Sequence, residues 1–135
     1  MLETYLLVLC VAAFIRNNEG KVLIVKKSLE EKVDGGLWTV PGGKIEPEEY
    51  IIDGLKREVM EEVGLQISSY KWLNEDVFPS GGYYFHGHHY LCTVEPGEIK
   101  LERKLENYAW ISKEDLDSYE FHPNIRKELD FIFYK

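Results

Sequence analysis

The sequence predicts an α/β (α+β) fold, in which a mixed β-sheet carries helices packed on its faces. Two apolar runs, residues 5–15 and 21–27, have the length and composition of strands. A helical period of apolar residues takes over across 47–63, and an amphipathic segment closes the chain from about 123 to 134. Strands that surround one central and one terminal helix are typical of a sheet covered by helices.

The strand predictions follow the apolar runs and the turn signals between them. The first two runs are joined by the turn signal of residues 17–20, so we expect a β-hairpin. Residues 28–36 are polar and form a loop, and a short strand at 37–40 stops at the turn of residues 41–43. Further strands are expected at 65–78, 83–94 and 108–111, with a turn at 79–82. Ser112 is suited to cap a short helix.

The central helix is predicted from an apolar stripe with a four-residue spacing. Pro47 suits the first turn of a helix, and Glu48 and Glu49 complement the positive end of its dipole. Gly64 is placed to end the helix. The stripe that would face the core consists of Ile51, Leu55, Val59 and Val63.

Length and charge restrict the class of protein. The 135 residues fit one domain, residues 1–135, and the net charge of −8 argues against binding to long nucleic acid. The apolar start is too short to span a bilayer and lacks a preceding basic region, so we expect a cytoplasmic protein without a membrane partner. Cys10 and Cys92 lie far apart, which favours two reduced thiols over a disulfide.

The chemistry is concentrated in three carboxylates on the central helix. Glu58, Glu61 and Glu62 stand at i, i+3 and i+4, which places them within an arc of roughly 100° on one side of the helix. Such a cluster of like charges is unfavourable unless something compensates it, and a hard cation such as Mg²⁺ or Mn²⁺ would do so. On spacing alone, a solvated acidic helix face is the more common explanation.

The stretch from Gly43 to Leu65 resembles the Nudix box. That family's pattern is matched at every position, namely Gly43, Glu49, Arg57, Glu58, Val59, Glu61, Glu62, Gly64 and Leu65. Residues 38–43 and 110–116 are similar to the segments that flank the box in the family. One departure is Glu48, where many members carry glycine, and we expect it to affect the loop rather than the activity.

The resemblance implies a Nudix-type α/β/α sandwich and a metal-dependent hydrolase. Glu58 and Glu62 would be metal ligands, Glu61 a third ligand or the group that orients the attacking water, and the carbonyl of Gly42 or Gly43 a further ligand. Arg57, together with Glu49, would shape the catalytic loop. A general base outside the box is sought at Glu106, for which ordinary surface charge is an equal alternative.

Substrate contacts are predicted less directly. Candidates for stacking on a base are Trp38, Tyr83, Tyr84 and Phe85, although aromatic residues on strands are more often core residues. Candidates for phosphate binding are Lys26, Lys27 and Lys32, with a solvated loop as the equal alternative. A zinc site at His86, His88 and His89 is disfavoured because no further ligand is evident, so these histidines are expected at a surface or cleft.

The function implied by the resemblance is hydrolysis of a phosphoric anhydride (pyrophosphate) bond in a nucleoside diphosphate-linked substrate. Nucleoside triphosphates, oxidised or not, and nucleotide sugars are the candidates, with Mg²⁺ or Mn²⁺ as cofactor. The alternative is an inactive nucleotide sensor of the same fold, against which the intact glutamates argue. Removal of an mRNA-type cap is less favoured because of the net charge. A homodimer is an open expectation.

Overall fold

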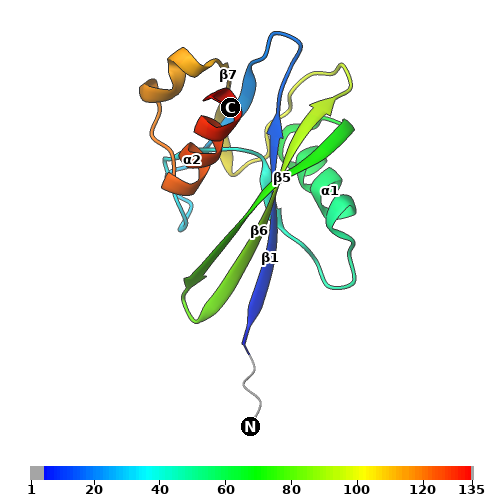
Figure 1. Ribbon diagram of the computed structural model, residues 1–135, viewed down its shortest axis with the longest axis vertical. Coiled ribbons are helices and arrows are strands. Elements are labelled where there is room, and N and C mark those ends of the chain that lie inside the picture. The colour runs from blue at the N-terminus through cyan, green and yellow to red at the C-terminus, as the bar shows by residue number, and fades with distance from the viewer. Residues whose placement is uncertain (1–4, 135) are drawn as a thin grey trace.

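The computed structural model describes residues 5–134, whose strands form two sheets that lie between helices (Figure 1). The four-stranded sheet has the order β4-β1-β6-β5, formed by Gly42–Lys44, Leu7–Ile15, Tyr83–Val94 and Ile67–Ser80. The three-stranded sheet has the order β3-β2-β7, formed by Trp38–Thr39, Val22–Lys27 and Leu105–Ile111. The helices are α1 (Ile51–Val63), the 3₁₀ helix η1 (Lys113–Ser118) and α2 (Pro123–Tyr134). The mixed α+β class is therefore confirmed, with two sheets in place of one.

The predicted β-hairpin at the start of the chain is wrong. The turn itself forms, because the Asn17 side chain accepts hydrogen bonds from the amides of Glu19 and Lys21. Beyond one isolated bridge between Arg16 and Val22, however, β1 and β2 separate into different sheets. β1 instead runs parallel to β6 along its whole length, a pairing between residues far apart in the chain that local turn signals cannot reveal.

Two apolar cores explain why the strands need helices on both sides. In β2, alternate side chains point to opposite faces, so Leu23 and Val25 join one core and Val22 and Ile24 the other. The first core contains the α1 stripe at Leu55, Val59 and Val63. The second contains Leu129 of α2 and Leu116 of η1. Figure 1 shows the result, with α1 on one side of the strands and α2 on the other.

The central helix begins four residues later than predicted, at Ile51 in place of Pro47. The reason lies at Glu48, whose backbone φ of 65° is left-handed and therefore breaks the helix before it can start. The glycine that is common at this position of the box would adopt the same conformation without strain. Gly64 ends the helix as predicted, with a φ of 71° and its amide donating to the Met60 carbonyl.

We expect the substitution Glu48→Gly to raise the free energy of unfolding by about 0.5–1 kcal/mol, because it relieves the left-handed strain. Urea denaturation measures the change. The control is Glu46→Gly, at a position without a positive φ, where the added backbone freedom of glycine should lower stability. A loss of stability in both variants would contradict the strain at Glu48.

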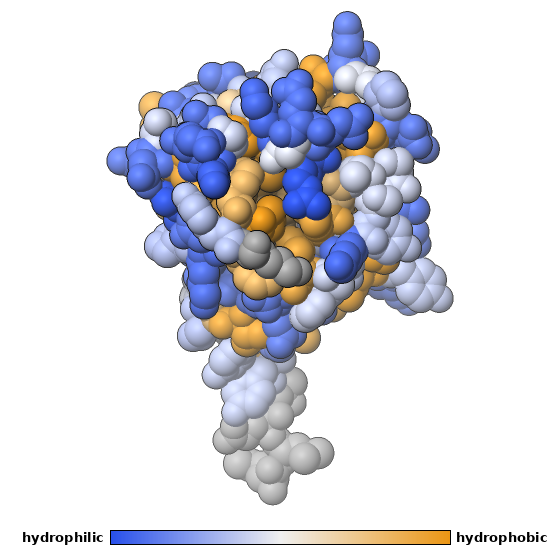
Figure 2. Space-filling view, turned by 45° about the horizontal axis from the view of Figure 1, so that its top comes forward, coloured by the Kyte–Doolittle hydropathy of each residue, from blue (hydrophilic) through white to orange (hydrophobic). Residues whose placement is uncertain are grey.

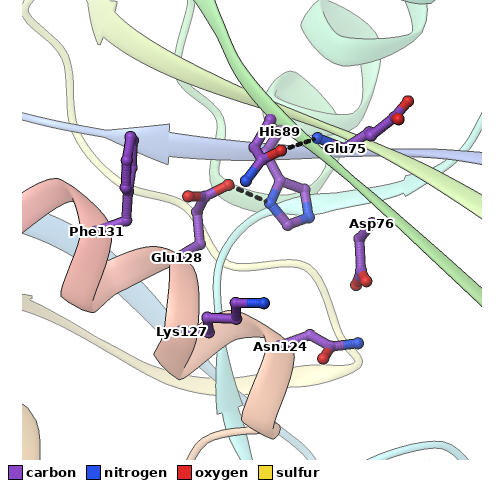
Figure 3. Close-up of a pocket in the computed structure, with 8 residues that line it drawn as sticks. Glu75, Asp76, His89, Asn124, Lys127, Glu128 and Phe131 are labelled. Atoms are coloured by element: carbon purple, nitrogen blue, oxygen red, sulfur yellow. Dashed lines mark hydrogen bonds and ion pairs between the residues drawn. The ribbon is translucent and has the colours of Figure 1, made fainter.

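α2 is attached to the four-stranded sheet by one buried polar contact as well as by its apolar face. His89 of β6 and Glu128 of α2 are 5% and 4% exposed, and His89 Nδ1 lies 2.8 Å from Glu128 Oε1. Figure 3 shows this pair at a pocket of about 120 Å³ between β5, β6 and α2, with Asp76 beyond the ring. His89 is therefore a buried histidine at the wall of this pocket and not a surface residue, so only the cleft position of the two that we expected applies to it.

We expect Glu128→Ala to lower the free energy of unfolding by about 3 kcal/mol, because it leaves a buried imidazole without its partner. The exposed Lys127→Ala on the same helix is the control and should change stability by no more than about 0.5 kcal/mol. Replacing both partners, as His89→Phe with Glu128→Leu, should recover most of the loss. Equal effects of the Glu128 and Lys127 variants in thermal or urea unfolding would show that the pair contributes nothing.

Hydrophilic side chains cover much of the face shown in Figure 2, and hydrophobic ones emerge in its middle. Exposed aromatic residues include Tyr70 and Trp72 on β5, which forms an edge of the four-stranded sheet.

Within residues 5–134, none of the helices has the length and apolar character needed to cross a bilayer.

Candidate active site

Two of the three predicted carboxylates are buried at the contact between α1 and β4. Glu58 and Glu62, one helical turn apart, are 8% and 5% exposed, whereas the side chain of Glu61 is about half exposed. Glu62 Oε1 accepts a hydrogen bond of 2.8 Å from the amide of Gly42. The helix thus presents carboxylates to the sheet backbone, beside the apolar stripe that enters the core.

Glycines of β4 make this contact possible. A Cβ atom on Gly43 would collide with the carboxyl group of Glu58, and one on Gly42 would collide with the backbone of Val11. The predicted turn of residues 41–43 is in fact the start of a strand, which pairs Gly42 with Ala12 and Gly43 with Val11 of β1. The Gly42 amide contacts the site through Glu62, and the predicted ligand role of the Gly42 carbonyl stays a prediction.

Arg57 connects α1 to the loop that precedes it, residues 44–50. Its guanidinium makes two parallel hydrogen bonds with Glu49, of 2.7 and 2.9 Å, and a third of 3.1 Å with the Lys44 carbonyl. The same group contacts Glu58 at 2.9 Å and Glu61 at 3.2 Å, so Arg57 binds two glutamates of the cluster as well as Glu49. Hydrogen bonds from Arg57 lower the pKa of Glu49 to about 2.

The pKa values of the two buried carboxylates, Glu58 and Glu62, are shifted upward instead. Burial raises the pKa of Glu62 to about 7, although the hydrogen bond from Gly42 and the charge of Lys104 both oppose the shift. Burial also raises the pKa of Glu58, against the stabilising contact with Arg57. Two anionic groups in this position are unfavourable without further positive charge.

The Glu62 side chain lines a cleft of about 1000 Å³. Glu62, Gly42 and Gly43 form part of its wall, and Lys27 and Lys104 are also exposed to it. The other walls come from three regions, namely the loop of residues 30–34, the Phe78 and Phe85 side chains of β5 and β6, and His122 before α2. A volume of this order accommodates a nucleotide-sized ligand.

Of the predicted substrate residues, Lys27, Lys32 and Phe85 line this cleft. Lys27 lines it, with its ammonium group held at 3.0 Å from the Val33 carbonyl. Trp38 packs edge-on against Tyr119 and belongs to the second core cluster. Tyr84 is 41% exposed and contacts Tyr5. Neither Trp38 nor Tyr84 lines the cleft, so the structure does not support their predicted stacking on a base.

Glu106 is also absent from the cleft wall. Its carboxylate pairs with Lys26 at 3.0 Å, whereas the neighbouring Leu105 points toward the interior. The ion pair matches the alternative of ordinary surface charge.

Sequence reasoning missed three residues of the cleft, Lys104, Phe78 and His122. Lys104 lies 3.6 Å from Glu62, and Phe78 stacks on Phe85 with ring centroids 5.2 Å apart. His122 accepts a hydrogen bond at Nδ1 from the Asn124 amide, which leaves Nε2 to carry the hydrogen of the neutral ring. No local motif marks these residues, since only the packing of β5, β6, β7 and α2 brings them to the box.

The donor set fits a hard divalent cation by its chemistry. Glu58, Glu61 and Glu62 supply carboxylate oxygens, the ligands that Mg²⁺ and Mn²⁺ prefer, and the inner two sit where positive charge is needed. In residues 5–134 as they stand, no three acidic, histidine or cysteine side chains converge closely enough to hold an ion. Lys104 lies against a carboxylate oxygen of Glu62 instead, so ion binding requires its side chain and the glutamates to rearrange.

Comparison with known proteins agrees with the box. The family model of the NUDIX domain matches residues 6–130. The chain belongs to the Nudix family. Nucleoside triphosphatase NudI of Escherichia coli K12 is 30% identical to this Nudix hydrolase over 83% of its chain and 87% of the relative.

Solved structures show the same fold. The MutT protein from Methanosarcina mazei Go1 superposes with a TM-score of 0.83 at 26% identity, covering 98% of this chain and 96% of that one. The NUDIX domain of Shewanella oneidensis NrtR, solved with ADP ribose, superposes with a TM-score of 0.75 at 16% identity, covering 96% and 86%. The second likeness is one of fold alone.

We expect Glu62→Gln to stabilise this Nudix hydrolase when no metal is present. Because the pKa of Glu62 is about 7 when folded and near 4.3 in an unfolded chain, the folded state binds more protons between these values. The wild type therefore loses stability as the pH rises through this range, and the neutral variant does not. At about pH 8 the gain should be on the order of 3 kcal/mol, disappearing below about pH 4.

Urea denaturation in EDTA at several pH values measures this gain. The exposed Glu61→Gln is the control and should change stability by less than about 1 kcal/mol. A Glu62→Gln protein that is no more stable than the wild type at about pH 8 would show that burial does not penalise the charged carboxylate.

Proposed function

We propose that this Nudix hydrolase is a Mg²⁺- or Mn²⁺-dependent pyrophosphohydrolase that acts on nucleoside triphosphates. The observation that supports the proposal best is the pair of buried carboxylates Glu58 and Glu62, of which Glu62 lines a large cleft that also carries lysines. Carboxylates that need a cation, next to ammonium groups that attract phosphate, are what hydrolysis of a phosphoric anhydride requires.

The cleft offers separate surfaces for the two ends of a nucleotide. Lys27, Lys32 and Lys44 line it on the side of the loop and β4, where they can neutralise phosphate charge. Phe78 and Phe85 form an apolar wall, and the Nε2 hydrogen of His122 is available to a base carbonyl or a phosphate oxygen. The name of the NudI relative, a nucleoside triphosphatase, supports this substrate class over nucleotide sugars.

The proposed reaction needs no covalent enzyme intermediate. Water adds to a phosphorus atom, the bridging P–O bond breaks, and the proton of the water passes to a carboxylate. The divalent cation, when bound, neutralises charge on the phosphate oxygens and makes water a better nucleophile. Glu58 and Glu62 would hold it, and the exposed Glu61 is suited to orient the water and accept its proton. Arg57 would keep Glu58 and Glu61 in place through its hydrogen bonds.

The alternative is a sensor that binds a nucleotide without turnover. One observation favours it, namely the fold shared with the NrtR domain that was solved with ADP ribose. The retention of Glu58, Glu61 and Glu62 favours the enzyme, because a sensor does not need a catalytic carboxylate set. Action in the cytoplasm and a homodimeric state stay predictions.

We expect Glu62→Gln to lower turnover of nucleoside triphosphates at least about a hundredfold, because it removes a ligand charge at the step that needs the cation. Release of pyrophosphate or phosphate in the presence of Mg²⁺ or Mn²⁺ measures the activity. Glu106→Gln is the control in the same assay. It should retain most of the activity if the Lys26 ion pair is its only role.

Equal turnover of wild type and Glu62→Gln would contradict the metal assignment. If the wild type bound nucleotides but hydrolysed none of a broad panel with either cation, the sensor would be the correct function.

A further inference from the structure

The two carboxylate oxygens of Glu62 have different partners. Oε1 accepts the hydrogen bond from the Gly42 amide, at 2.8 Å, and this contact ties the side chain to β4. Oε2 faces the ammonium group of Lys104, at 3.6 Å. One oxygen therefore holds the carboxylate in place, and the other is the oxygen available to a cation from the cleft.

Lys104 is the only cation with an ion pair to Glu62 in the part of the chain that the structure describes. Arg57, the other cation of the site, is committed to Glu49, Glu58 and Glu61. Because Glu62 is 5% exposed, its charge is not screened by water as it would be at the surface. The Lys104 ammonium therefore supplies positive charge where the sequence leads us to expect a metal ion.

Lys104 also has a second carboxylate within reach. Its Nζ lies 3.9 Å from Glu102 Oε2, and both side chains are more than one-third exposed. The backbone near it is held, since the Lys104 carbonyl accepts from the Ser28 amide and the Glu102 amide donates to the Glu62 carbonyl, both at 2.9 Å. A flexible side chain on a fixed backbone can move between two carboxylates without a change of fold.

We propose that Lys104 is a resident counter-ion, which takes the cation position at Glu62 in the metal-free protein and shifts to Glu102 when a divalent cation binds. This inference rests on the proposed function, because it takes Glu62 as a metal ligand. An ammonium ion and a divalent cation repel each other, so both cannot contact Glu62 Oε2 closely. Lys104 consequently lowers metal affinity while it stabilises the empty site.

The test is Mn²⁺ binding to the full chain without substrate, measured by titration calorimetry or by the electron paramagnetic resonance of free Mn²⁺. We expect Lys104→Met, which keeps the length of the side chain and removes its charge, to bind Mn²⁺ about three- to tenfold more tightly than the wild type. Lys104→Arg restores the charge and should bind within about twofold of the wild type. Circular dichroism and urea denaturation check that each variant is folded.

Lys44→Met is the matched control for net charge. Lys44 lines the same cleft but makes no ion pair with Glu62 among the residues described. We expect this variant to change Mn²⁺ affinity by less than about twofold. If Lys104→Met bound Mn²⁺ no more tightly than the wild type, or no more tightly than Lys44→Met, the counter-ion role would be overturned.

Glu102→Gln tests the shift to the second carboxylate. In the wild-type background it should weaken Mn²⁺ binding more than in the Lys104→Met background, because only the former loses an alternative partner for the ammonium. Equal effects in both backgrounds would overturn the shift. Glu62→Gln separates this proposal from the one on which it rests: if wild type and Glu62→Gln bound Mn²⁺ equally, the metal site itself would be wrong and the Lys104 proposal would fall with it.

Discussion

The burial of two carboxylates between α1 and the backbone of β4 is the constraint on which the active site depends. Gly43 leaves room for the Glu58 carboxyl group, and Gly42 lets β4 lie close against the backbone of β1, because neither residue carries a side chain. The charge placed there has a cost, visible in the raised pKa of both groups. Three contacts offset part of this unfavourable charge. Arg57 binds Glu58, and the Gly42 amide and the Lys104 ammonium group each contact one oxygen of Glu62.

The same helix serves the core and the site because its two faces have different tasks. Leu55, Val59 and Val63 are fully buried and hold α1 against the strands. That packing sets the distance from α1 to β4, so the geometry of the carboxylates is determined by the apolar stripe as much as by the acidic residues. β1 and β2 belong to different sheets. As a result, the edge of the four-stranded sheet that is formed by β4 lies beside β2 and the loop before β3. The cleft lies at this junction, with Gly42 on one side and Lys27 on the other.

Electrostatic compensation in this site depends on where each cation is held. Arg57 is a fixed part of the structure, because its planar group is bonded to Glu49, Glu58, Glu61 and a backbone carbonyl at once. Lys104 has looser contacts and a second carboxylate nearby. The fixed Arg57 can hold the glutamates in place without occupying the metal position. The mobile Lys104 can occupy that position and leave it when a metal ion binds. The raised pKa of Glu62 despite Lys104 indicates that an ammonium group at 3.6 Å compensates the buried charge only in part.

The sequence by itself determined the fold class, the extent of α2, the end of α1 at Gly64 and the spacing of the three glutamates on that helix. Each of these depends on contacts between near neighbours in the chain or on a motif of fixed spacing, such as the i, i+3, i+4 set of glutamates. Only the tertiary structure decided the pairing of β1 with β6, the left-handed Glu48 that delays α1, and the membership of the cleft. Lys104 and His122 line the cleft, and Trp38 and Tyr84 do not, because strand pairing and helix packing join segments that are distant in the chain. The spacing of apolar residues along the sequence does not reveal such long-range contacts.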